Sequence, residues 1–219
     1  MNRKWYVYAA LGVLLLIVPL FTAAQDDMGW IIRVRGISIN PNDSSSVIAG
    51  TGTRIGVDSK VVPEVDFTFK FNKQFGMELV LATARHDLKT EGGLLGGVSA
   101  GSVRILPPTL TFQYYFQTGT AFQPYMGIGV NFTRFYSYNL STPLRMAGVT
   151  SVEFKNSFDV AGQVGMDYNF ADHWLFNLDV KYIRISTDVT PRLYTGAPLD
   201  IIKVDVDPWV FGIGFGYRF

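Results

Sequence analysis

The sequence predicts an all-β protein: an eight-stranded antiparallel transmembrane β-barrel of the outer-membrane type, with long extracellular loops and short periplasmic turns. Three observations predict this fold. Apolar and polar residues alternate with a period of two in eight segments. Short and long connections alternate strictly between these segments. No stretch after the first 24 residues is apolar for long enough to cross a bilayer as a helix.

The start of the chain resembles an export signal. Two basic residues precede an apolar run over residues 7–21, and small residues follow at Thr22 and Ala24. This order is typical of a secretory signal peptide. We therefore expect a signal peptide at residues 1–24 and a barrel at residues 25–219. A retained membrane anchor is the alternative, but the run is short for a spanning helix and a proline interrupts its end.

The composition excludes several classes of function. The 219 residues include no cysteine and two histidines, and the formal net charge is +1. Without cysteine the chain has no disulfide, no thiolate metal site and no cysteine nucleophile. A net charge close to zero provides no field that attracts nucleic acid. We expect no metal, no cofactor and no nucleic-acid partner.

The alternation defines the strands. Between residues 64 and 71 the odd positions are large and apolar, whereas the even positions are polar. A tilted strand needs about 9–11 residues to cross a bilayer, and the segments are close to this length. The same alternation recurs in seven further segments, at residues 30–35, 77–82, 109–116, 125–133, 163–168, 174–182 and 209–219.

The connections assign the two ends of the barrel. Short turns at residues 72–74, 117–120 and 169–173 belong to the periplasmic end, where aromatic residues also gather and predict an interfacial girdle. Backbone donors cannot stay unpaired in hydrocarbon, so the strands must close on themselves. The long connections, expected on the outside, are residues 38–60, 85–104, 137–152 and 188–202.

The glycines indicate which face lies inside. A soluble barrel of the lipocalin type would place the apolar face inward, and alternation alone does not exclude it. A narrow barrel needs small groups in its interior, and the glycines share their phase with the charged residues. We therefore expect the polar face inside and the apolar face against lipid. The glycines in this phase are Gly127, Gly129, Gly165, Gly212, Gly214 and Gly216.

The interior of eight strands is only wide enough for side chains, so a wide aqueous pore is excluded. Toward the long loops the inward positions are small or apolar, as at Val80, Ala82, Ala161 and Ile183. Toward the turns they carry both charges, which should pair because an unpaired buried charge is costly. We expect a polar plug there, made of Arg33, Lys70, Glu78, Asp167, Asp179 and Arg218.

Prolines interrupt the alternation, most clearly at Pro107 and Pro108. Each proline removes a donor from the strand ladder. Such prolines end regular pairing where strands leave the membrane. The alternative is a lateral opening through which an apolar molecule passes sideways into the bilayer.

Four motifs, at residues 106–109, 124–133, 161–168 and 207–219, are spread over nearly the whole chain after residue 24. Together they resemble the outer-membrane protein W (OmpW) family, which includes alkane-uptake members. The resemblance implies an eight-stranded barrel in the Gram-negative outer membrane, with a hydrophobic channel for small hydrophobic molecules. It also implies an apolar constriction at Val80 and Phe158, although Phe158 falls on the lipid phase when counted from Asp167. The terminal aromatic pattern ending at Phe219 is similar to the insertion signal of the barrel-assembly machinery.

The expected function is passive uptake of small hydrophobic molecules, through an apolar outer lumen above the charged plug. The expected partners are such a solute, the lipids and lipopolysaccharide of the outer membrane and, during insertion, the barrel-assembly machinery. A structural barrel, or one that binds a host or phage through its loops, is the alternative. We expect no enzymatic activity; the one candidate is an acyl-transfer site formed by His86, Asp87, Ser99 and Ser102.

Overall fold

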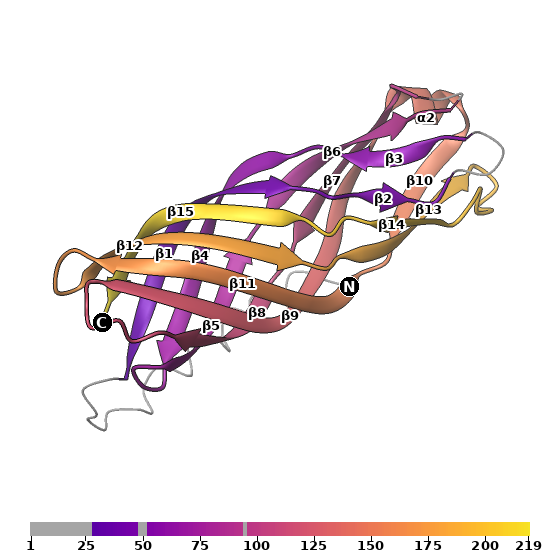
Figure 1. Cartoon of the computed structure of the whole chain (residues 1–219). Coiled ribbons are helices and arrows are strands. Elements are labelled where there is room, and N and C mark those ends of the chain that lie inside the picture. The colour runs from indigo at the N-terminus through magenta and orange to yellow at the C-terminus, as the bar shows by residue number, and fades with distance from the viewer. Residues whose placement is uncertain (1–27, 48–51, 94–95) are drawn as a thin grey trace, which may run out of the picture.

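Eight antiparallel strands form a closed barrel in the computed structural model, which describes residues 28–47, 52–93 and 96–219 (Figure 1). Each strand pairs with the next one along the chain, and the last pairs with the first. The predicted fold class is confirmed, while the predicted signal peptide lies outside the described residues. The barrel strands are β1 (Gly29–Asn40), β4 (Lys60–Lys70), β5 (Phe75–Ala82), β8 (Thr109–Tyr115), β9 (Phe122–Leu140), β11 (Ser157–Asn169), β12 (Trp174–Ile183) and β15 (Trp209–Arg218).

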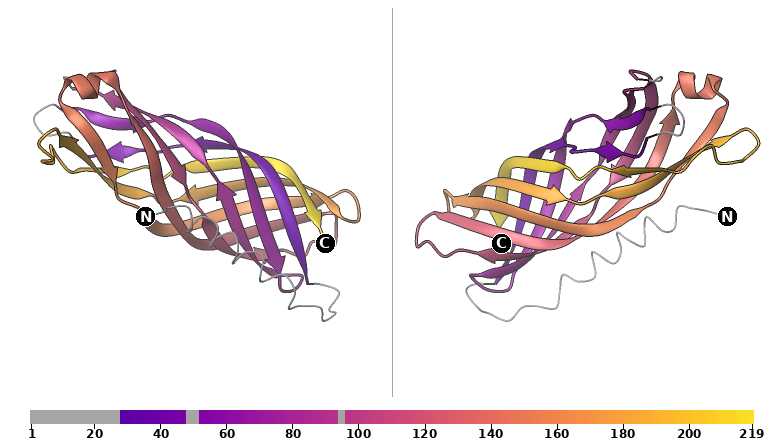
Figure 2. Two further views of the ribbon diagram at one scale, coloured as in Figure 1. Left: turned by 180° about the vertical axis from the view of Figure 1, so that it is seen from behind. Right: turned by 45° about the vertical axis from the view of Figure 1, so that its right-hand side comes forward.

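The long connections contain strands of their own, where the sequence predicts only loops. Strand β9 is 19 residues long and pairs with β8 and β11 in the barrel, then with β7 above it. Beyond the barrel the chain therefore continues as two β-sheet layers (Figure 2). They contain β2 (Ser44–Ser45), β3 (Arg54–Val57), β6 (Ala84–Glu91), β7 (Ser99–Leu106), β10 (Val149–Phe154), β13 (Ser186–Leu193) and β14 (Ile202–Asp205), and a short helix, α2 (Thr142–Met146), precedes β10.

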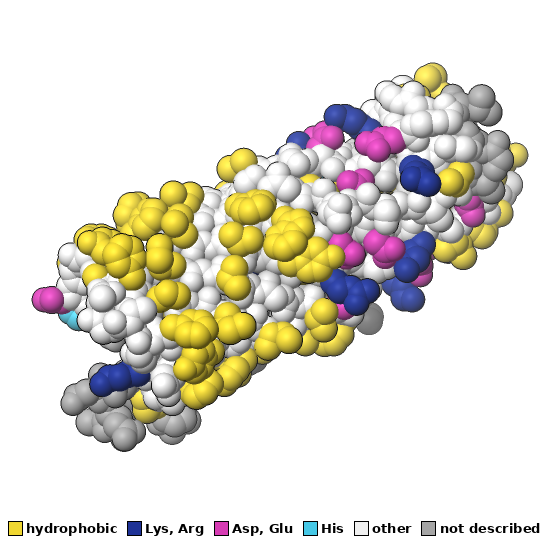
Figure 3. Space-filling view, in the orientation of Figure 1, with side chains coloured by type: hydrophobic (Ala, Val, Ile, Leu, Met, Phe, Trp, Pro, Cys, Tyr) yellow, Lys and Arg dark blue, Asp and Glu magenta, His cyan; other side chains and the backbone are white. Residues whose placement is uncertain are grey.

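The two faces of the barrel have the predicted orientation. Arg33 and Arg35 point inward and are fully or almost fully buried, whereas Val34 between them is 57% exposed. Large apolar side chains cover the half of the molecule toward the turns, and charged side chains gather on the other half (Figure 3). The lipocalin-type alternative is therefore wrong. Across the described ranges, no helix is long and apolar enough to span a membrane.

Aromatic rings surround the turn end of the barrel, as predicted. The Trp30 ring centroid lies 5.0 Å from that of Phe69, and a series of ring contacts continues across β4, β5 and β8 to Phe116. On the other side of the barrel Phe122 contacts Tyr168 at 4.7 Å. Amphipathic and aromatic rings at this level are typical of a membrane interface.

Glycines permit the strands to pack closely around the polar interior. A Cβ added to Gly214 on β15 would lie 2.1 Å from the carbonyl oxygen of Val34 and 2.7 Å from the Cα of Arg35. These contacts are with backbone, which cannot rotate away. By contrast, a Cβ at Gly36 on the neighbouring β1 meets no atom within 4 Å.

We therefore expect Gly214→Ala to lower the free energy of unfolding by about 1–3 kcal/mol, the usual cost of overpacking a filled interior. Gly36→Ala, which adds a methyl group on the open outer face, should change it by less than about 0.5 kcal/mol. Urea unfolding in phospholipid vesicles measures both values. Equal stability of the two variants would contradict the close packing at Gly214.

Candidate functional site

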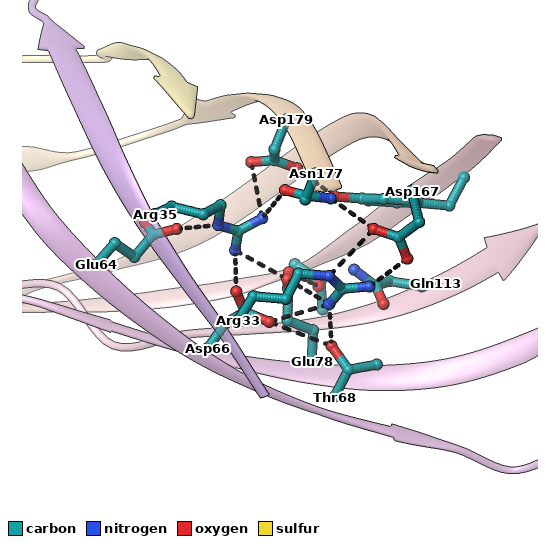
Figure 4. A network of polar contacts seen from close by, with 12 residues as sticks. Arg33, Arg35, Glu64, Asp66, Thr68, Glu78, Gln113, Asp167, Asn177 and Asp179 are labelled. Carbon is teal, nitrogen blue, oxygen red and sulfur yellow. Dashed lines mark hydrogen bonds and ion pairs between the residues drawn. The ribbon is translucent and has the colours of Figure 1, made fainter. Parts of the chain in front are cut away.

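A buried polar network fills the barrel toward the turns (Figure 4). Arg33 on β1 forms a two-pronged contact with Asp167 on β11, with N–O distances of 3.2 and 2.7 Å. Its guanidinium also donates to Asp66 at 3.0 Å and to Thr68 at 2.7 Å, both on β4. One arginine thus joins strands on opposite sides of the barrel. Two-pronged arginine–carboxylate pairs fix geometry as well as charge.

Arg35, two residues further along β1, is the other centre of the network. Its guanidinium nitrogens lie 2.8 Å from Glu64, 2.8 Å from Asp66, 3.0 Å from Glu78 and 3.6 Å from Asp179. Lys181 adds contacts to Glu64, at 3.1 Å, and to Asp179. Three cations therefore face five carboxylates: Arg33, Arg35 and Lys181 against Glu64, Asp66, Glu78, Asp167 and Asp179.

The predicted plug residues separate into two groups. Arg33, Glu78, Asp167 and Asp179 belong to this network. Lys70 and Arg218 lie closer to the turns and line a cavity of about 310 Å³ there, together with Lys73. Lys70 Nζ sits 4.0 Å from the ring centroid of Tyr115 and donates to Gln123, and Arg218 donates to Asn169. The predicted plug did not include four further members of the network, although they lie in the same inward-facing phase of their strands: Arg35, Glu64, Asp66 and Lys181.

An apolar cluster occupies the interior above the network. Val80 is 3% exposed and pairs with Asp66 on one side and Thr109 on the other, so it lies beside the polar layer. Ala161 and Ile183, predicted to face inward, are buried in the cluster, and Ala82 packs against it. The remaining buried members come from β1, from β15, from the link between β12 and β13, and from the strands above the barrel: Ile37, Ile39, Ile55, Ala84, Leu88, Ala100, Val103, Ile105, Ile185, Val189, Ile202, Val204 and Val210.

A cavity of about 40 Å³ lies within this cluster. Its lining is aliphatic and aromatic except for His86 and Thr187. A volume of this size holds no more than a few water-sized spheres, whereas an apolar cavity that binds benzene measures about 150 Å³. The side chains around the cavity must therefore move apart before a solute enters.

His86 points into the interior and is 3% exposed. Its Nδ1 lies 3.0 Å from the carbonyl oxygen of Asp58. Burial lowers the pKa of His86 below its usual value, so the imidazole is neutral at pH 7. The other members of the suggested acyl-transfer site have different partners, since Ser102 accepts from Arg85 and Asp87 pairs with Lys60 at 2.7 Å.

The assignment of Phe158 to a channel constriction is wrong. Its side chain is 71% exposed, and it pairs with Phe132 of β9 on the outer face. The register between β9 and β11 runs without a shift from Ser157 to Tyr168, so no bulge turns this residue inward. The alternation counted from Asp167 predicts its direction correctly, and the resemblance does not.

Strand pairing is interrupted beside Pro107 and Pro108. The β5–β8 ladder ends at the pair Val80–Thr109, and the β6–β7 ladder begins at Ala84–Ile105. On the other flank the same prolines are held, because the Phe132 backbone N–H donates to the Pro108 carbonyl at 3.0 Å. The barrel wall is thus fastened on the β9 side and lacks ladder pairs on the β5 side.

The C-terminal residue closes the aromatic girdle. The backbone N–H of Phe219 donates to the carbonyl of Trp30 at 2.9 Å, and its ring centroid lies 4.9 Å from that of Tyr217. Its side chain is 66% exposed. The terminal ring is therefore presented on the lipid-facing side at the periplasmic end.

Comparisons with known proteins agree with this architecture. A family model described as "OmpW family" matches residues 28–219. Outer membrane protein W of Vibrio cholerae is 33% identical over 204 residues, which cover 92% of each chain. The dibenzothiophene metabolism operon protein PahQ of Pseudomonas aeruginosa is 24% identical, over 93% of this chain and 97% of its own. The crystal structure of the outer membrane protein OprG from Pseudomonas aeruginosa shares 37% identity and a TM-score of 0.79, over 88% of this chain and 96% of that one. The chain, an outer-membrane β-barrel, therefore belongs to the OmpW family.

Proposed function

We propose that this barrel is a passive channel for the uptake of small hydrophobic molecules from outside the cell. The observation that carries the proposal is the division of the interior into an apolar outer part and an ionic inner part. An apolar solute gains free energy on leaving water for the apolar cluster, at about 25 cal/mol per Å² of surface buried. The name of the relative PahQ, which refers to dibenzothiophene metabolism, supports a solute of this kind.

In this proposal the ionic network closes the periplasmic end of the channel to an apolar solute. An apolar molecule that passed straight down would have to separate Arg33 and Arg35 from buried carboxylates at 2.7–3.0 Å. Breaking a buried pair costs about 3–5 kcal/mol, because it leaves uncompensated charges in the barrel interior. The network thus favours a different exit.

The exit that we propose is sideways, beside Pro107 and Pro108. The β5–β8 seam lacks ladder pairs between Val80–Thr109 and Ala84–Ile105, at the height where the polar layer meets the apolar cluster. A solute stopped by the network lies next to this seam. Opening it requires no loss of ladder hydrogen bonds on the β5 side, and it leads into the hydrocarbon of the bilayer.

Replacing Val103 with tryptophan tests the channel. Val103 is 3% exposed and lines the apolar cavity, so a larger side chain fills the space that the solute needs. We expect uptake of a labelled apolar solute by a deletion strain carrying the variant to fall about tenfold, which corresponds to a loss of about 1.4 kcal/mol in the solute's binding free energy. Val34→Trp, on the lipid-facing side of β1, should leave uptake at the wild-type rate.

Exposed apolar side chains at the outer end of the molecule favour a second candidate function, contact with a host cell or phage. Tyr194 is 81% exposed, Met146 79% and Ile201 65%. If Val103→Trp left uptake unchanged while deletion of residues 194–201 abolished adhesion or phage adsorption, contact with a partner would replace uptake as the function.

Insertion into the membrane would use the terminal aromatic residue. We propose that exposed Phe219 and the neighbouring rings form the segment that the barrel-assembly machinery binds. The aromatic girdle would then rest at the inner interface of the bilayer, and the charged residues above the barrel would face the lipopolysaccharide headgroups.

A further inference from the structure

Three arginines form a group on the outer surface of the sheet above the barrel. Arg85 lies on β6, Arg104 on β7 and Arg134 on β9, which are neighbouring strands, and all three side chains are exposed. The ladder places Arg104 directly opposite Arg85. Arg134 pairs with Leu106, two residues further along β7, so Arg104 and Arg134 are diagonal neighbours. This group is called the arginine patch below.

The arginine patch has no ionic partner of its own in the described part of the chain. Like charges directly opposite one another in a sheet are unfavourable. Nevertheless, no carboxylate of residues 28–47, 52–93 and 96–219 forms an ion pair with any arginine of the patch. Asp87, two residues from Arg85 on β6, pairs with Lys60 at 2.7 Å. The Arg85 guanidinium donates to the hydroxyl of Ser102, which carries no charge. The patch therefore presents three positive charges that an anion would compensate.

The patch begins where the apolar outer surface ends. Leu106 and Phe132 have exposed side chains, and each lies two residues from an arginine of the patch on its own strand. Exposed Phe158 of β11 pairs with Phe132 and extends the apolar surface sideways. Two residues of a strand span about 6.6 Å. An amphiphile whose acyl chains pack on these apolar side chains would therefore bring its headgroup to the arginines.

We propose that the arginine patch binds the phosphates of lipid A, the membrane anchor of lipopolysaccharide, whose acyl chains pack on Leu106, Phe132 and Phe158. A guanidinium donates two parallel hydrogen bonds to a phosphate, and a phosphate between Arg85 and Arg104 would remove their repulsion. An acidic protein surface is a poorer occupant, because it brings no acyl chains for the adjoining apolar side chains. The proposal rests on the contact with lipopolysaccharide proposed above, which it assigns to named residues, and it is independent of uptake.

Binding of three lipids to the protein in detergent, measured by native mass spectrometry, tests the site. The probes are diphosphorylated lipid A, monophosphorylated lipid A and phosphatidylglycerol, and we expect the wild-type protein to prefer them in that order. Basic residues at an anionic lipid surface contribute about 1 kcal/mol each. Arg104→Gln should therefore weaken binding of diphosphorylated lipid A about fivefold, and the double variant Arg104→Gln with Arg134→Gln about 30-fold.

Two controls separate the site from net charge and from folding. Arg145→Gln removes the same charge from α2, at the far outer end of the molecule, and should change lipid A binding less than twofold (Figure 1). In vesicles of neutral lipid, Arg104→Gln should unfold at a urea concentration no lower than that of the wild type, because it removes the like-charge pair with Arg85. In vesicles that contain lipid A, it should unfold at a lower urea concentration than the wild type, because it loses the stabilising ligand.

Equal binding of diphosphorylated lipid A by the wild type and the double variant would overturn the proposal. Equal affinity of the wild type for phosphatidylglycerol and diphosphorylated lipid A would overturn it as well, since the patch would then attract any anionic surface. If the double variant lost adhesion or phage adsorption while lipid A binding stayed unchanged, the occupant would be a protein and the proposal would be wrong. Val103→Trp tests uptake separately, so failure of the lipid site and failure of the channel give different results.

Discussion

Replacing Arg35 with methionine is expected to lower the free energy of unfolding by about 3–5 kcal/mol, the usual cost of removing one partner from a buried ion network. Arg35 lies within 3.0 Å of Glu64, Asp66 and Glu78. Without it, two cations face five carboxylates in a space closed to water. Urea unfolding in phospholipid vesicles, followed by tryptophan fluorescence, measures the loss.

Arg218→Met is the matched control for this experiment. Arg218 belongs to the same inward phase but lies near the turns, where its guanidinium donates to Asn169. We expect a cost below about 1 kcal/mol, as for a partly exposed contact. The double variant Arg35→Met with Glu78→Gln should recover part of the loss, because residues within one network are not additive. If Arg35→Met unfolded at the wild-type urea concentration, the network would not stabilise the barrel.

Ile128→Arg is expected to cost about 2–4 kcal/mol, the cost of placing arginine on the lipid face of a barrel near the bilayer midplane. Ile128 is 71% exposed and lies on β9 midway between Phe122 in the girdle and exposed Arg134. Folding efficiency and urea unfolding in vesicles both report this cost.

An arginine placed on the outer face near the membrane interface, instead of near the midplane, is the control for this experiment. Val61 is 78% exposed, also on the outer face, but pairs with Ser38 near the outer edge of the barrel. At such an interface arginine costs about 0–1 kcal/mol. Equal losses for Ile128→Arg and Val61→Arg would show that the apolar surface is not embedded as the fold implies.

The barrel itself was predictable because two features of the sequence agree on it. Alternation along each segment defines the strands, and glycines in the charged phase identify the interior, as Gly214 beside Val34 and Arg35 illustrates. The strands above the barrel were not predictable in the same way. In β6 the face toward the second sheet is apolar, so His86 occurs on a face where only hydrophobic residues are expected.

For the candidate site, the sequence predicts which side chains point into the barrel but not which of them are in contact. Inward direction follows from counting residues, which places Arg33, Glu78 and Asp179 correctly and rejects Phe158. Which inward side chains contact one another depends on the register between neighbouring strands, and the sequence of a single strand does not determine that register. Arg33 meets Asp167, 134 positions away, only because the three pairings β1–β15, β15–β12 and β12–β11 set their relative heights.

Pairing of β1 with β15 has a consequence for biogenesis. The ring joins the first barrel strand to the last one, so the barrel cannot close until β15 has been synthesised and exported. Without β15 the sheet stays open and has two edge strands, whose unpaired backbone N–H and C=O groups are too costly to place in hydrocarbon. A chain that stops before β15 should therefore fail to insert as a closed barrel.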